Sequence, residues 1–290
     1  MNMTARLRQL LKDDAFLIAP GCFNAGSARL VEQAGFPAVY ISGAAVAGNY
    51  LGMPDMGLAS MHEVLENARR IVQAVGIPAI CDVDTGYGNA LNVVRTVREF
   101  EAAGLAGVQL EDQVMPKKCG HTEGKLLVSK QEMVQKIRAA VETRRDPDFV
   151  LIARTDAIAV TGLADAIERM NAYREAGADV LFVEAPPTVE AMQTVTRSVP
   201  GLHLANMVEG GGKTPILPAA QLRQIGYRMA IYPVSAWMAS IKAIQEILTV
   251  LRTAGTTEPC AARLVSFQEM FESVGRSACI KTEQQYTAER

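Results

Sequence analysis

The chain has 290 residues, of which 49% are hydrophobic and 21% are charged, and its formal net charge is −2. These values are typical of a soluble globular protein, and the lack of a run of like charges argues against nucleic acid or a membrane as a partner. The five cysteines show no CxxC spacing, so they fit a reducing compartment better than a disulfide framework or a zinc site. Because the sequence shows no signal peptide or membrane-spanning run, we expect a cytoplasmic protein.

Short apolar runs alternate with amphipathic segments along almost the whole chain. The apolar runs lack strict alternation, which is typical of strands that are covered on both faces. The eight predicted strands comprise residues 16–20, 38–42, 79–84, 107–111, 149–155, 180–184, 203–207 and 229–232. Helical patterns lie between them, for example over residues 91–103, 130–143 and 163–176.

A weak internal repeat places a glycine after a helix and before a strand. Gly35, Gly104, Gly177 and Gly226 occupy this place in four segments that resemble one another. Recurring helix–Gly–strand units predict parallel strands with right-handed crossovers. Eight such strands favour an α/β fold of the closed (β/α)8 TIM barrel type, with an open doubly wound sheet as the alternative.

We expect a single domain over residues 1–290, because no linker interrupts this pattern. An N-terminal segment would occupy residues 1–15, with a helix over residues 1–12, and the barrel would follow over residues 16–257. Residues 258–290 would form a C-terminal extension that is helical to residue 277 and ends in a polar tail.

Polar residues gather where the predicted strands end, and in an α/β barrel the active site lies at that end. The residues at these places are Ser42, Gly43, Ala44, Asp82, Asp84, Glu111, Asp112, Arg154, Asp156, Glu184, Asn206 and Glu209. Asp82, Asp84 and Glu111 form an oxygen-rich set that suits Mg²⁺ or Mn²⁺ with water completing the coordination. An ion-pair network with Arg154 or a lysine is the alternative. The planar guanidinium of Arg154 suits a substrate carboxylate, unless it serves as a partner for Glu184.

Residues 110–125, LEDQVMPKKCGHTEGK, form the segment on which the interpretation of the rest of the chain depends most. Lys117, Lys118 and His121 flank Cys119, and their positive charge should lower the pKa of its thiol. Gly120 and the glycine at position 124 allow the loop to bend, as a lid over a site must. An ordinary surface loop that holds a cysteine and some lysines is the alternative.

Several motifs resemble the isocitrate lyase/phosphoenolpyruvate mutase superfamily, in order from about Leu7 to about Phe271. They are SGAAVA and MPD at positions 42–55, DVDTGYGN, LEDQ, KKCGH, ARTDA and NMVEGG. KKCGH is similar to the catalytic loop of the lyase branch, which the mutase and phosphonopyruvate hydrolase branches lack. The resemblance implies a Mg²⁺ site and a barrel whose last helix is exchanged between the subunits of a homotetramer.

The resemblance also implies roles for single residues. Asp84 matches the direct metal ligand, while Asp82 and Glu111 match partners that act through water. The backbone cradle for the 2-oxo or 2-hydroxy acid end of the substrate matches Ser42, Gly43 and Ala44. Cys119 matches the catalytic acid, and Gly120 beside it is placed next to the substrate. Further site positions match Asp55, Arg154, Glu184 and Asn206.

These roles predict a Mg²⁺-dependent retro-aldol cleavage of a 2-hydroxy dicarboxylate. Cleavage leaves a carbanion next to the second carboxylate, which Arg154, Asn206 and Glu184 would hold. Cys119 would deliver the proton, with His121 and the lysines, Lys117 among them, ordering the loop and tuning the thiol. The base that removes the hydroxyl proton would be Tyr40 or Asp55. A non-catalytic 2-oxo acid binder and an oxaloacetate hydrolase or decarboxylase are the alternatives.

The C-terminal part of the chain bears on the substrate and on assembly. As we align it, the 2-methylisocitrate lyase branch has arginines where this chain has Trp237-Met238 and Phe267. Apolar side chains there favour 2,3-dimethylmalate or a 2-alkylmalate over a tricarboxylate. Alternatively, these residues pack a subunit contact, and Arg263 or Arg228 pairs with the third carboxylate. The apolar surplus of residues 237–253 predicts a homo-oligomer, and the resemblance makes it a tetramer.

Overall fold

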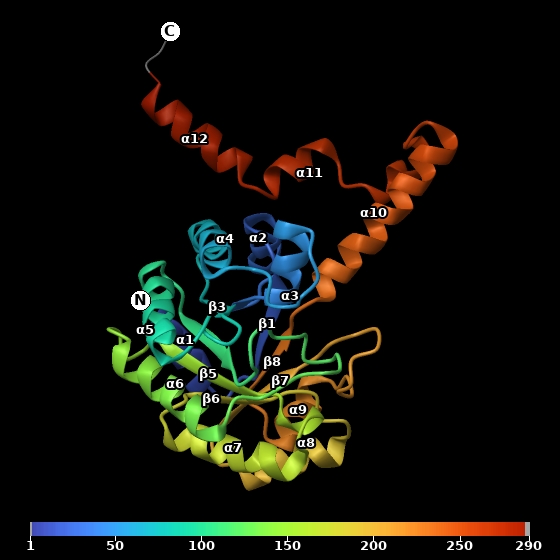
Figure 1. The fold of residues 1–290 in the computed structure, drawn as a ribbon. Coiled ribbons are helices and arrows are strands. Elements are labelled where there is room, and N and C mark those ends of the chain that lie inside the picture. The colour runs from blue at the N-terminus through green and yellow to red at the C-terminus, as the bar shows by residue number, and fades with distance from the viewer. Residues whose placement is uncertain (1, 288–290) are drawn as a thin grey trace. The chain divides into compact units, whose positions relative to one another are not determined.

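A computed structural model describes residues 2–287, so the first residue of the expected N-terminal helix and the last three of the expected tail lie outside the described residues. Eight parallel strands close into a barrel, with β1 paired to both β2 and β8 (Figure 1). The strands are β1 (Leu17–Cys22), β2 (Val39–Ile41), β3 (Ala79–Asp82), β4 (Gly107–Glu111), β5 (Val150–Thr155), β6 (Val180–Val183), β7 (Leu202–Asn206) and β8 (Met229–Tyr232). The predicted (β/α)8 barrel is confirmed, and the open doubly wound sheet is wrong.

Helices that follow the strands form the outer layer. They are α2 (Ala25–Gln33), α4 (Met61–Ala74), α5 (Ala90–Ala102), α6 (Lys130–Thr143), α7 (Leu163–Glu175), α8 (Val189–Ser198) and α9 (Ala219–Ile225). Helix α1 (Met3–Lys12) precedes β1, the short α3 (Gly43–Val46), η1 (Ala47–Leu51) and η2 (Ala157–Ala159) lie in the loops after β2 and β5, and α10 (Ser235–Ala254) follows β8. Side-chain caps fix several starts, because Ser60 accepts a hydrogen bond from the backbone of Glu63 at α4, and Ser129 does so from Glu132 at α6.

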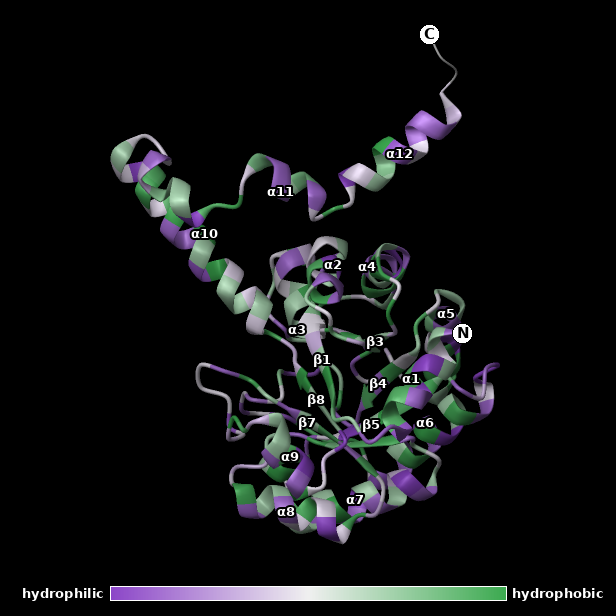
Figure 2. Cartoon of the chain, turned by 180° about the vertical axis from the view of Figure 1, so that it is seen from behind, coloured by the Kyte–Doolittle hydropathy of each residue, from purple (hydrophilic) through white to green (hydrophobic). Residues whose placement is uncertain are grey.

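The core has two apolar layers. One fills the barrel and includes Leu17, Tyr40, Ile80 and Phe182, and Leu7 of α1 packs into the same cluster. The other lies between the strands and the outer helices. Figure 2 shows the consequence, since the strands are largely apolar while the outer helices alternate between apolar and polar positions.

Helix α1 is held at the amino-terminal end of the barrel by charged groups. Arg8 Nη1 and Arg144 Nη1 lie 2.8 Å and 2.7 Å from the carboxylate of Asp179, which precedes β6. Arg228 donates hydrogen bonds to the carbonyls of Leu10 and Leu11 at this same end. The expectation that Arg228 could pair with a substrate carboxylate is therefore wrong, because Arg228 precedes β8 and the site lies beyond the other end of the strand.

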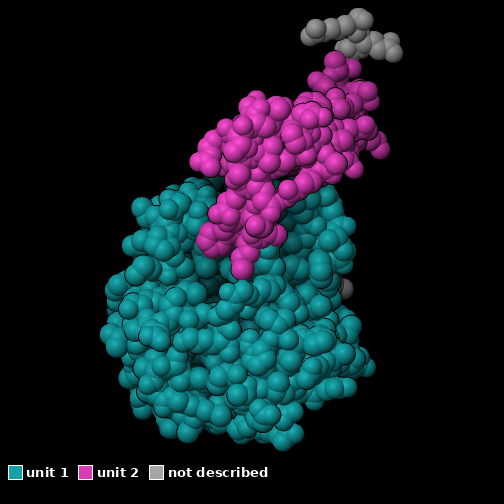
Figure 3. All heavy atoms as spheres, turned by 90° about the vertical axis from the view of Figure 1, so that its right-hand side faces the viewer, with its two compact units in different colours: residues 1–236 teal, residues 237–290 magenta. Residues whose placement is uncertain are grey.

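The chain divides into two compact units, residues 1–236 and residues 237–290 (Figure 3). The boundary between the units falls inside α10, whose continuous helical sequence contains no Gly or Pro, and the single domain over residues 1–290 with a barrel to residue 257 stays a prediction. The second unit consists of the rest of α10, η3 (Glu258–Arg263), α11 (Phe267–Glu272) and α12 (Arg276–Tyr286). Helix α12 corrects the expectation of a polar tail after residue 277. Its sequence is polar on most sides and therefore carries little amphipathic signal.

Apolar side chains remain exposed in the second unit. Phe267 is 76% exposed, Leu248 57% and Ile244 56%. None of the helices within residues 2–287 combines the length and apolar character needed to cross a bilayer.

Candidate active site

A cavity of about 90 Å³ opens where the strands of the barrel end. The predicted site residues that line it are Tyr40, Ser42, Ala44, Asp55, Asp82, Lys117, Cys119, Gly120, His121, Arg154, Glu184 and Asn206. Gly43 and Asp84 line a smaller adjoining cavity of about 10 Å³, together with Asp55 and Asp82. Glu111 contacts Arg154, which lines the larger cavity, with its Oε2 atom 3.3 Å from Arg154 Nε. The barrel therefore brings the residues predicted from the strand ends into one region.

The end of β3 brings two carboxylates together. The backbone N–H of Asp84 donates to Asp82 Oδ1 over 3.1 Å, and Asp84 has a positive φ of 49° that is uncommon for a residue with a side chain. The backbone of Gly43 lies against the side chain of Asp82. A Cβ atom at position 43 would be 2.9 Å from Asp82 Oδ2, which is too close for a side chain to fit without a shift of Asp82. Burial and the charge of Asp84 raise the pKa of Asp82 to about 6.

The acidic cluster, which consists of Asp82, Asp84 and Glu111, carries more negative charge than the neighbouring cations Lys117 and Arg154 compensate. Burial raises the pKa of Asp84, and it raises that of Glu111 well above its ordinary value. Glu111 Oε1 is buried without a hydrogen-bond partner among residues 2–287. Over the same residues, no three acidic, histidine or cysteine side chains converge closely enough to enclose a metal ion. An oxygen-only cluster of this kind fits a hard cation that keeps several waters and binds few protein ligands directly.

Lys117 connects the loop after β4 to this cluster. Its ammonium contacts Asp55 and lies 2.7 Å from Asp84 Oδ1, and its side chain is buried. Burial lowers the pKa of Lys117, but Asp84 and then Glu111 outweigh burial and raise this pKa well above its ordinary value. The ion-pair network with a lysine and with Arg154, the alternative to a metal site, is thus present in the structure. The metal itself stays a prediction.

The environment of Cys119 differs from the one expected. Burial raises the pKa of its thiol. The backbone hydrogen bond involving His121 lowers this pKa, but by a smaller amount. The prediction of a lowered pKa is wrong, because the Lys117 ammonium is directed to Asp55 and Asp84 and the partial burial of the sulfur disfavours the thiolate. A thiol with a raised pKa keeps its proton at neutral pH, which suits a proton donor rather than a nucleophile.

His121 joins two loops of the site. Its Nδ1 accepts a hydrogen bond of 3.0 Å from the backbone of Lys213, in the loop after β7, and its Nε2 lies 3.3 Å from Glu184 Oε1. Burial lowers the pKa of His121, which favours the neutral ring. Because Nδ1 accepts, the proton of the neutral ring is assigned to Nε2, facing Glu184.

Arg154 is surrounded by carboxylates. Its guanidinium forms two hydrogen bonds with Asp156, of 2.9 Å and 3.0 Å, and Nη1 lies 3.1 Å from Glu184 Oε2. The expected pairing of Arg154 with Glu184 is confirmed, and its role in binding a substrate carboxylate stays a prediction. Asn206 donates a hydrogen bond of 3.0 Å to Glu184 Oε2, so Arg154 of β5, Glu184 directly after β6 and Asn206 of β7 form a polar wall.

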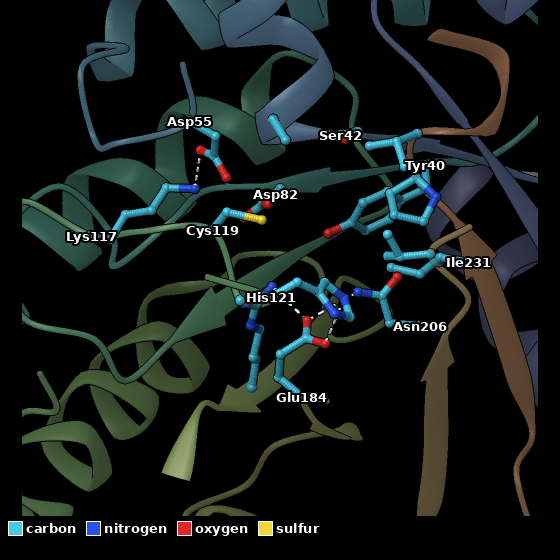
Figure 4. Close-up of a pocket in the computed structure, with 16 residues that line it drawn as sticks. Tyr40, Ser42, Asp55, Asp82, Lys117, Cys119, His121, Glu184, Asn206 and Ile231 are labelled. Atoms are coloured by element: carbon cyan, nitrogen blue, oxygen red, sulfur yellow. Dashed lines mark hydrogen bonds and ion pairs between the residues drawn. The ribbon is translucent and has the colours of Figure 1, made fainter. Parts of the chain in front are cut away.

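Figure 4 shows how these groups face one another. Asp55 and Lys117 lie on one side of the cavity, and His121, Glu184 and Asn206 lie on another, with the Cys119 sulfur directed into the space between. The cavity is therefore flanked by an acidic cluster that suits a cation, a wall that carries Arg154, and a protonated thiol on a loop.

A family model described as phosphoenolpyruvate phosphomutase matches residues 7–252. The chain belongs to this family. It is 46% identical over 290 residues to a 2,3-dimethylmalate lyase of Eubacterium barkeri, with 100% of both chains covered. It is 45% identical over 269 residues to a 2-methylisocitrate lyase of Aeropyrum pernix, which covers 93% of this chain and 86% of that protein.

Solved structures of other phosphoenolpyruvate phosphomutase family members are similar over the whole chain. An oxaloacetate acetylhydrolase in complex with 3,3-difluorooxalacetate superposes with a TM-score of 0.94 at 35% identity, covering 99% of this chain and 98% of that chain. A 2,3-dimethylmalate lyase gives 0.92 at 36%, with 98% and 95% covered. A phosphonopyruvate hydrolase in complex with oxalate and Mg²⁺ gives 0.89 at 34%, with 99% of each chain covered.

Two features of this phosphoenolpyruvate phosphomutase family site were missed by sequence reasoning. The first is an apolar wall, formed by Val208 after β7, Ile231 in β8, and Pro233 and Val234 after β8. In the sequence, only the position of these four residues at or after strand ends could have indicated that they line the site. The second is the buried ammonium of Lys125, in the same loop as Cys119. Nothing in the sequence distinguishes this lysine from its exposed neighbours.

Proposed function

We propose that this chain is a Mg²⁺-dependent carbon–carbon lyase that cleaves a 2-hydroxy dicarboxylate, 2,3-dimethylmalate or a 2-alkylmalate, to pyruvate plus propionate or a related acid. The observation that carries the proposal is the position and state of Cys119. Its thiol faces the cavity, burial raises its pKa, and the loop that holds it carries the KKCGH motif. Retro-aldol cleavage requires a group that protonates a carbanion, and a protonated thiol over the cavity can do so.

The residues of the chain divide the reaction between them. The C2–C3 bond breaks, its electron pair stays on C3, and Cys119 delivers the proton to that carbon. Arg154 is held by Asp156 and Glu184 and lines the cavity, so it would bind the carboxylate next to C3. Asn206, whose Oδ1 is buried without a partner in the described chain, would hold the same end together with Glu184.

The hydroxyl proton at C2 needs a base. Burial and the charge of Asp82 raise the pKa of Tyr40 well above its ordinary value, and its hydroxyl donates to Gln109 over 2.5 Å. A phenol in this state keeps its proton, so we assign the role of base to Asp55, which lines the cavity and contacts Lys117. Lys117 and His121 order the loop around the thiol.

The metal would be held by Asp84 directly and by Asp82 and Glu111 through water, and Mn²⁺ could replace Mg²⁺. The raised pKa values of these carboxylates and the unpartnered Glu111 Oε1 are what a cation would compensate. When bound, Mg²⁺ supplies positive charge that stabilises the negative charge on the 2-oxygen. A related protein, the phosphonopyruvate hydrolase, has been crystallised with Mg²⁺ and oxalate.

Ser42, Gly43 and Ala44 would bind the carboxylate and 2-oxygen end of the substrate, with Gly120 above it. Ser42 and Ala44 line the cavity, and Gly43 lies against Asp82 and Asp84. The apolar wall that includes Ile231 and Val234 would receive alkyl substituents, since each buried CH₂ contributes about 0.8 kcal/mol. The full-length match to a 2,3-dimethylmalate lyase supports this substrate class.

Two other activities are supported by specific relatives. The 45% identity to a 2-methylisocitrate lyase supports cleavage of a tricarboxylate to pyruvate and succinate. The similarity to an oxaloacetate acetylhydrolase supports action on oxaloacetate, as a hydrolase or decarboxylase. A non-catalytic 2-oxo acid binder is the least supported of the alternatives, since it leaves the protonated thiol of Cys119 without a role.

One set of assays separates these activities. Purified protein with Mg²⁺ is given 2,3-dimethylmalate, 2-methylisocitrate or oxaloacetate, and the products are identified by mass spectrometry while kcat/KM is measured. We expect pyruvate and propionate from 2,3-dimethylmalate at the highest kcat/KM. A clear preference for 2-methylisocitrate, or release of oxalate or CO₂ from oxaloacetate as the main activity, would assign the chain to one of the alternatives. Addition of EDTA is expected to abolish turnover, and Mg²⁺ to restore it.

We further propose a cytoplasmic homotetramer, without nucleic acid or membrane as a partner. The exposed apolar side chains of residues 237–290, such as Ile244 and Phe267, support burial in an assembly. Exchange of α10 between subunits belongs to the same proposal. Light scattering at protein concentrations on the order of micromolar should give a tetramer mass, and a monomer mass would contradict it.

A further inference from the structure

The loop that carries Cys119 is closed at its base by backbone hydrogen bonds. We define the flap as residues 114–126. Val114 N–H donates to the carbonyl of Leu126 over 2.8 Å, and Val128 N–H donates to the carbonyl of Asp112 over 2.9 Å. Gln113 and Leu127 pair in an antiparallel bridge. These bonds fix the two ends of the flap, but they do not fix the segment around Cys119 that covers the cavity.

Gly120 brings that segment against the wall of the site. A Cβ atom at this position would lie 2.6 Å from Glu184 Cγ and would overlap the guanidinium of Arg154, so the backbone approaches these side chains as closely as a glycine allows. The carbonyl of Gly120 is thereby taken away from water. A buried carbonyl needs a hydrogen-bond donor, because an unsatisfied one destabilises the closed flap.

Lys125 supplies that donor from within the flap. Its ammonium contacts the carbonyl oxygen of Gly120 and lies 3.4 Å from Asp156 Oδ1. Its side chain is 1% exposed and that of Asp156 is 0% exposed, so the contact is shielded from water and from salt. Burial raises the pKa of Asp156, but the charges of Arg154 and then Lys125 outweigh burial and lower it below its ordinary value.

We propose that Lys125 is a positioning residue that latches the flap, by joining the carbonyl of Gly120 to the carboxylate of Asp156. The carbonyl belongs to the Gly120–His121 peptide group, so the latch fixes the backbone one residue after Cys119 and thereby holds the thiol over the cavity. Asp156 also forms two hydrogen bonds with Arg154, so the same carboxylate positions the proton donor and the proposed ligand of the substrate carboxylate. Lys125 does not touch the substrate in this arrangement. It acts through Cys119.

The test compares Lys125→Met with a matched control, Lys130→Met. Lys130 is a nearby lysine at the start of α6 whose ammonium is partly exposed and contacts Glu168 on the surface. The first readout is the alkylation rate of Cys119 by iodoacetamide, followed peptide by peptide by mass spectrometry, with the exposed Cys279 as an internal reference. This readout needs no substrate and so does not depend on the proposed function. The second readout is kcat and KM, which does rest on that function.

For Lys125→Met we expect Cys119 to be alkylated about tenfold faster relative to Cys279, equivalent to closure weakened by ~1.4 kcal/mol. Removal of a positive charge disfavours the thiolate, so a faster reaction can come only from exposure of the sulfur. We expect kcat to fall about 10–100-fold, as for a misplaced catalytic group, while KM changes by less than about threefold. Lys130→Met should match the parent in both readouts.

A folded Lys125→Met protein with the parental alkylation rate at Cys119 would overturn the latch, and one with parental kcat would overturn the positioning role. If Lys125→Met does not fold, Lys125→Gln is read by the same criteria, because it removes the charge and shortens the side chain but keeps a polar group. If neither variant folds, Lys125 is required for folding, and the proposal of a positioning role is rejected.

Discussion

At the amino-terminal end of the barrel, Asp179 has two guanidinium partners, Arg8 and Arg144, and its carboxylate also accepts a hydrogen bond from the backbone of Leu151. At the carboxyl end, Asp82 and Asp84 lie side by side, and their pKa values are raised by burial. The charge that precedes β6 is therefore compensated, whereas the carboxylates at the end of β3 carry an excess of buried negative charge.

Backbone geometry follows the same division. Among residues 2–287, the non-glycine residues with positive φ are Asp84, Tyr87 and Ala185, and they lie in the loops that follow β3 and β6. Strained backbone and uncompensated charge persist only where the rest of the fold stabilises them, and they are typical of functional sites. We therefore expect substitutions at the carboxyl end to reduce activity more than stability, and substitutions at the amino-terminal end to do the reverse.

The largest effect is expected for Cys119→Ser. A serine hydroxyl is a much weaker acid than a thiol, so kcat should fall about 10²–10⁴-fold, the usual contribution of a positioned acid. The free energy of unfolding, measured with urea, should change by less than ~1 kcal/mol, because the two side chains are similar in size. Cys279→Ser, at an exposed cysteine, is the control. Turnover by Cys119→Ser at the parental rate would remove Cys119 from the mechanism.

The opposite pattern is expected for Leu7→Ala at the amino-terminal end. Leu7 of α1 is fully buried in the cluster that fills the barrel, so its truncation should lower the free energy of unfolding by about 2–5 kcal/mol. The folded fraction should retain parental kcat at a temperature below its unfolding transition. Leu30→Ala, at a 55% exposed position on α2, should change stability by less than ~0.5 kcal/mol. A large loss of kcat with little loss of stability in Leu7→Ala would contradict the division between the two ends.

The barrel was predictable because its signals are local and repeated. Each strand is an apolar run, and the glycines at positions 35, 104 and 177 mark the turns that precede β2, β4 and β6. Predicted and observed strands differ by two residues or fewer at each end, and β4 and β8 agree at both ends. Helix α3 was not predicted, because four residues are too few to show a helical period.

The site was predictable as a set of residues but not in its electrostatics. Parallel strands place their carboxyl ends together, so Asp82, Arg154 and Glu184 were expected to meet. The shift in the pKa of Cys119 was predicted with the wrong sign, because its sequence neighbours suggest a cationic loop, whereas the fold directs Lys117 to Asp84 and partly buries the sulfur. The contact of Lys125 with Asp156 depends on how the flap folds back onto β5, which no local pattern encodes.

A moderate effect is expected for Asp82→Asn in metal-free protein. The substitution removes a buried charge next to Asp84 while keeping the size of the side chain, so it should raise the free energy of unfolding by about 0.5–2 kcal/mol at neutral pH. Activity with Mg²⁺ should fall, because Asp82 is a proposed partner of the metal through water. Asp14→Asn, at an exposed aspartate, should leave both quantities unchanged. A loss of stability in Asp82→Asn would show that the carboxylates at this end are compensated after all.

The smallest effect concerns the pH dependence of the amino-terminal end. Asp146 accepts hydrogen bonds from Thr4 Oγ1 over 2.6 Å, from the backbone of Asp148 over 2.9 Å and from Asn2 over 2.8 Å, and these bonds hold its pKa below the ordinary value. Because the unfolded chain binds the proton more tightly, this stabilisation is present above a pH of about 3.9 and is lost as the pH falls through the lower pKa of the folded state. The carboxylate is near the surface, so the loss should stay below ~1 kcal/mol.

Urea unfolding between about pH 5 and pH 3 should show a shallower decline in the free energy of unfolding for Asp146→Asn than for the parent, because the variant has no carboxylate to protonate at position 146. Equal slopes for the two proteins would mean that Asp146 does not tie α1 to the loop before β5.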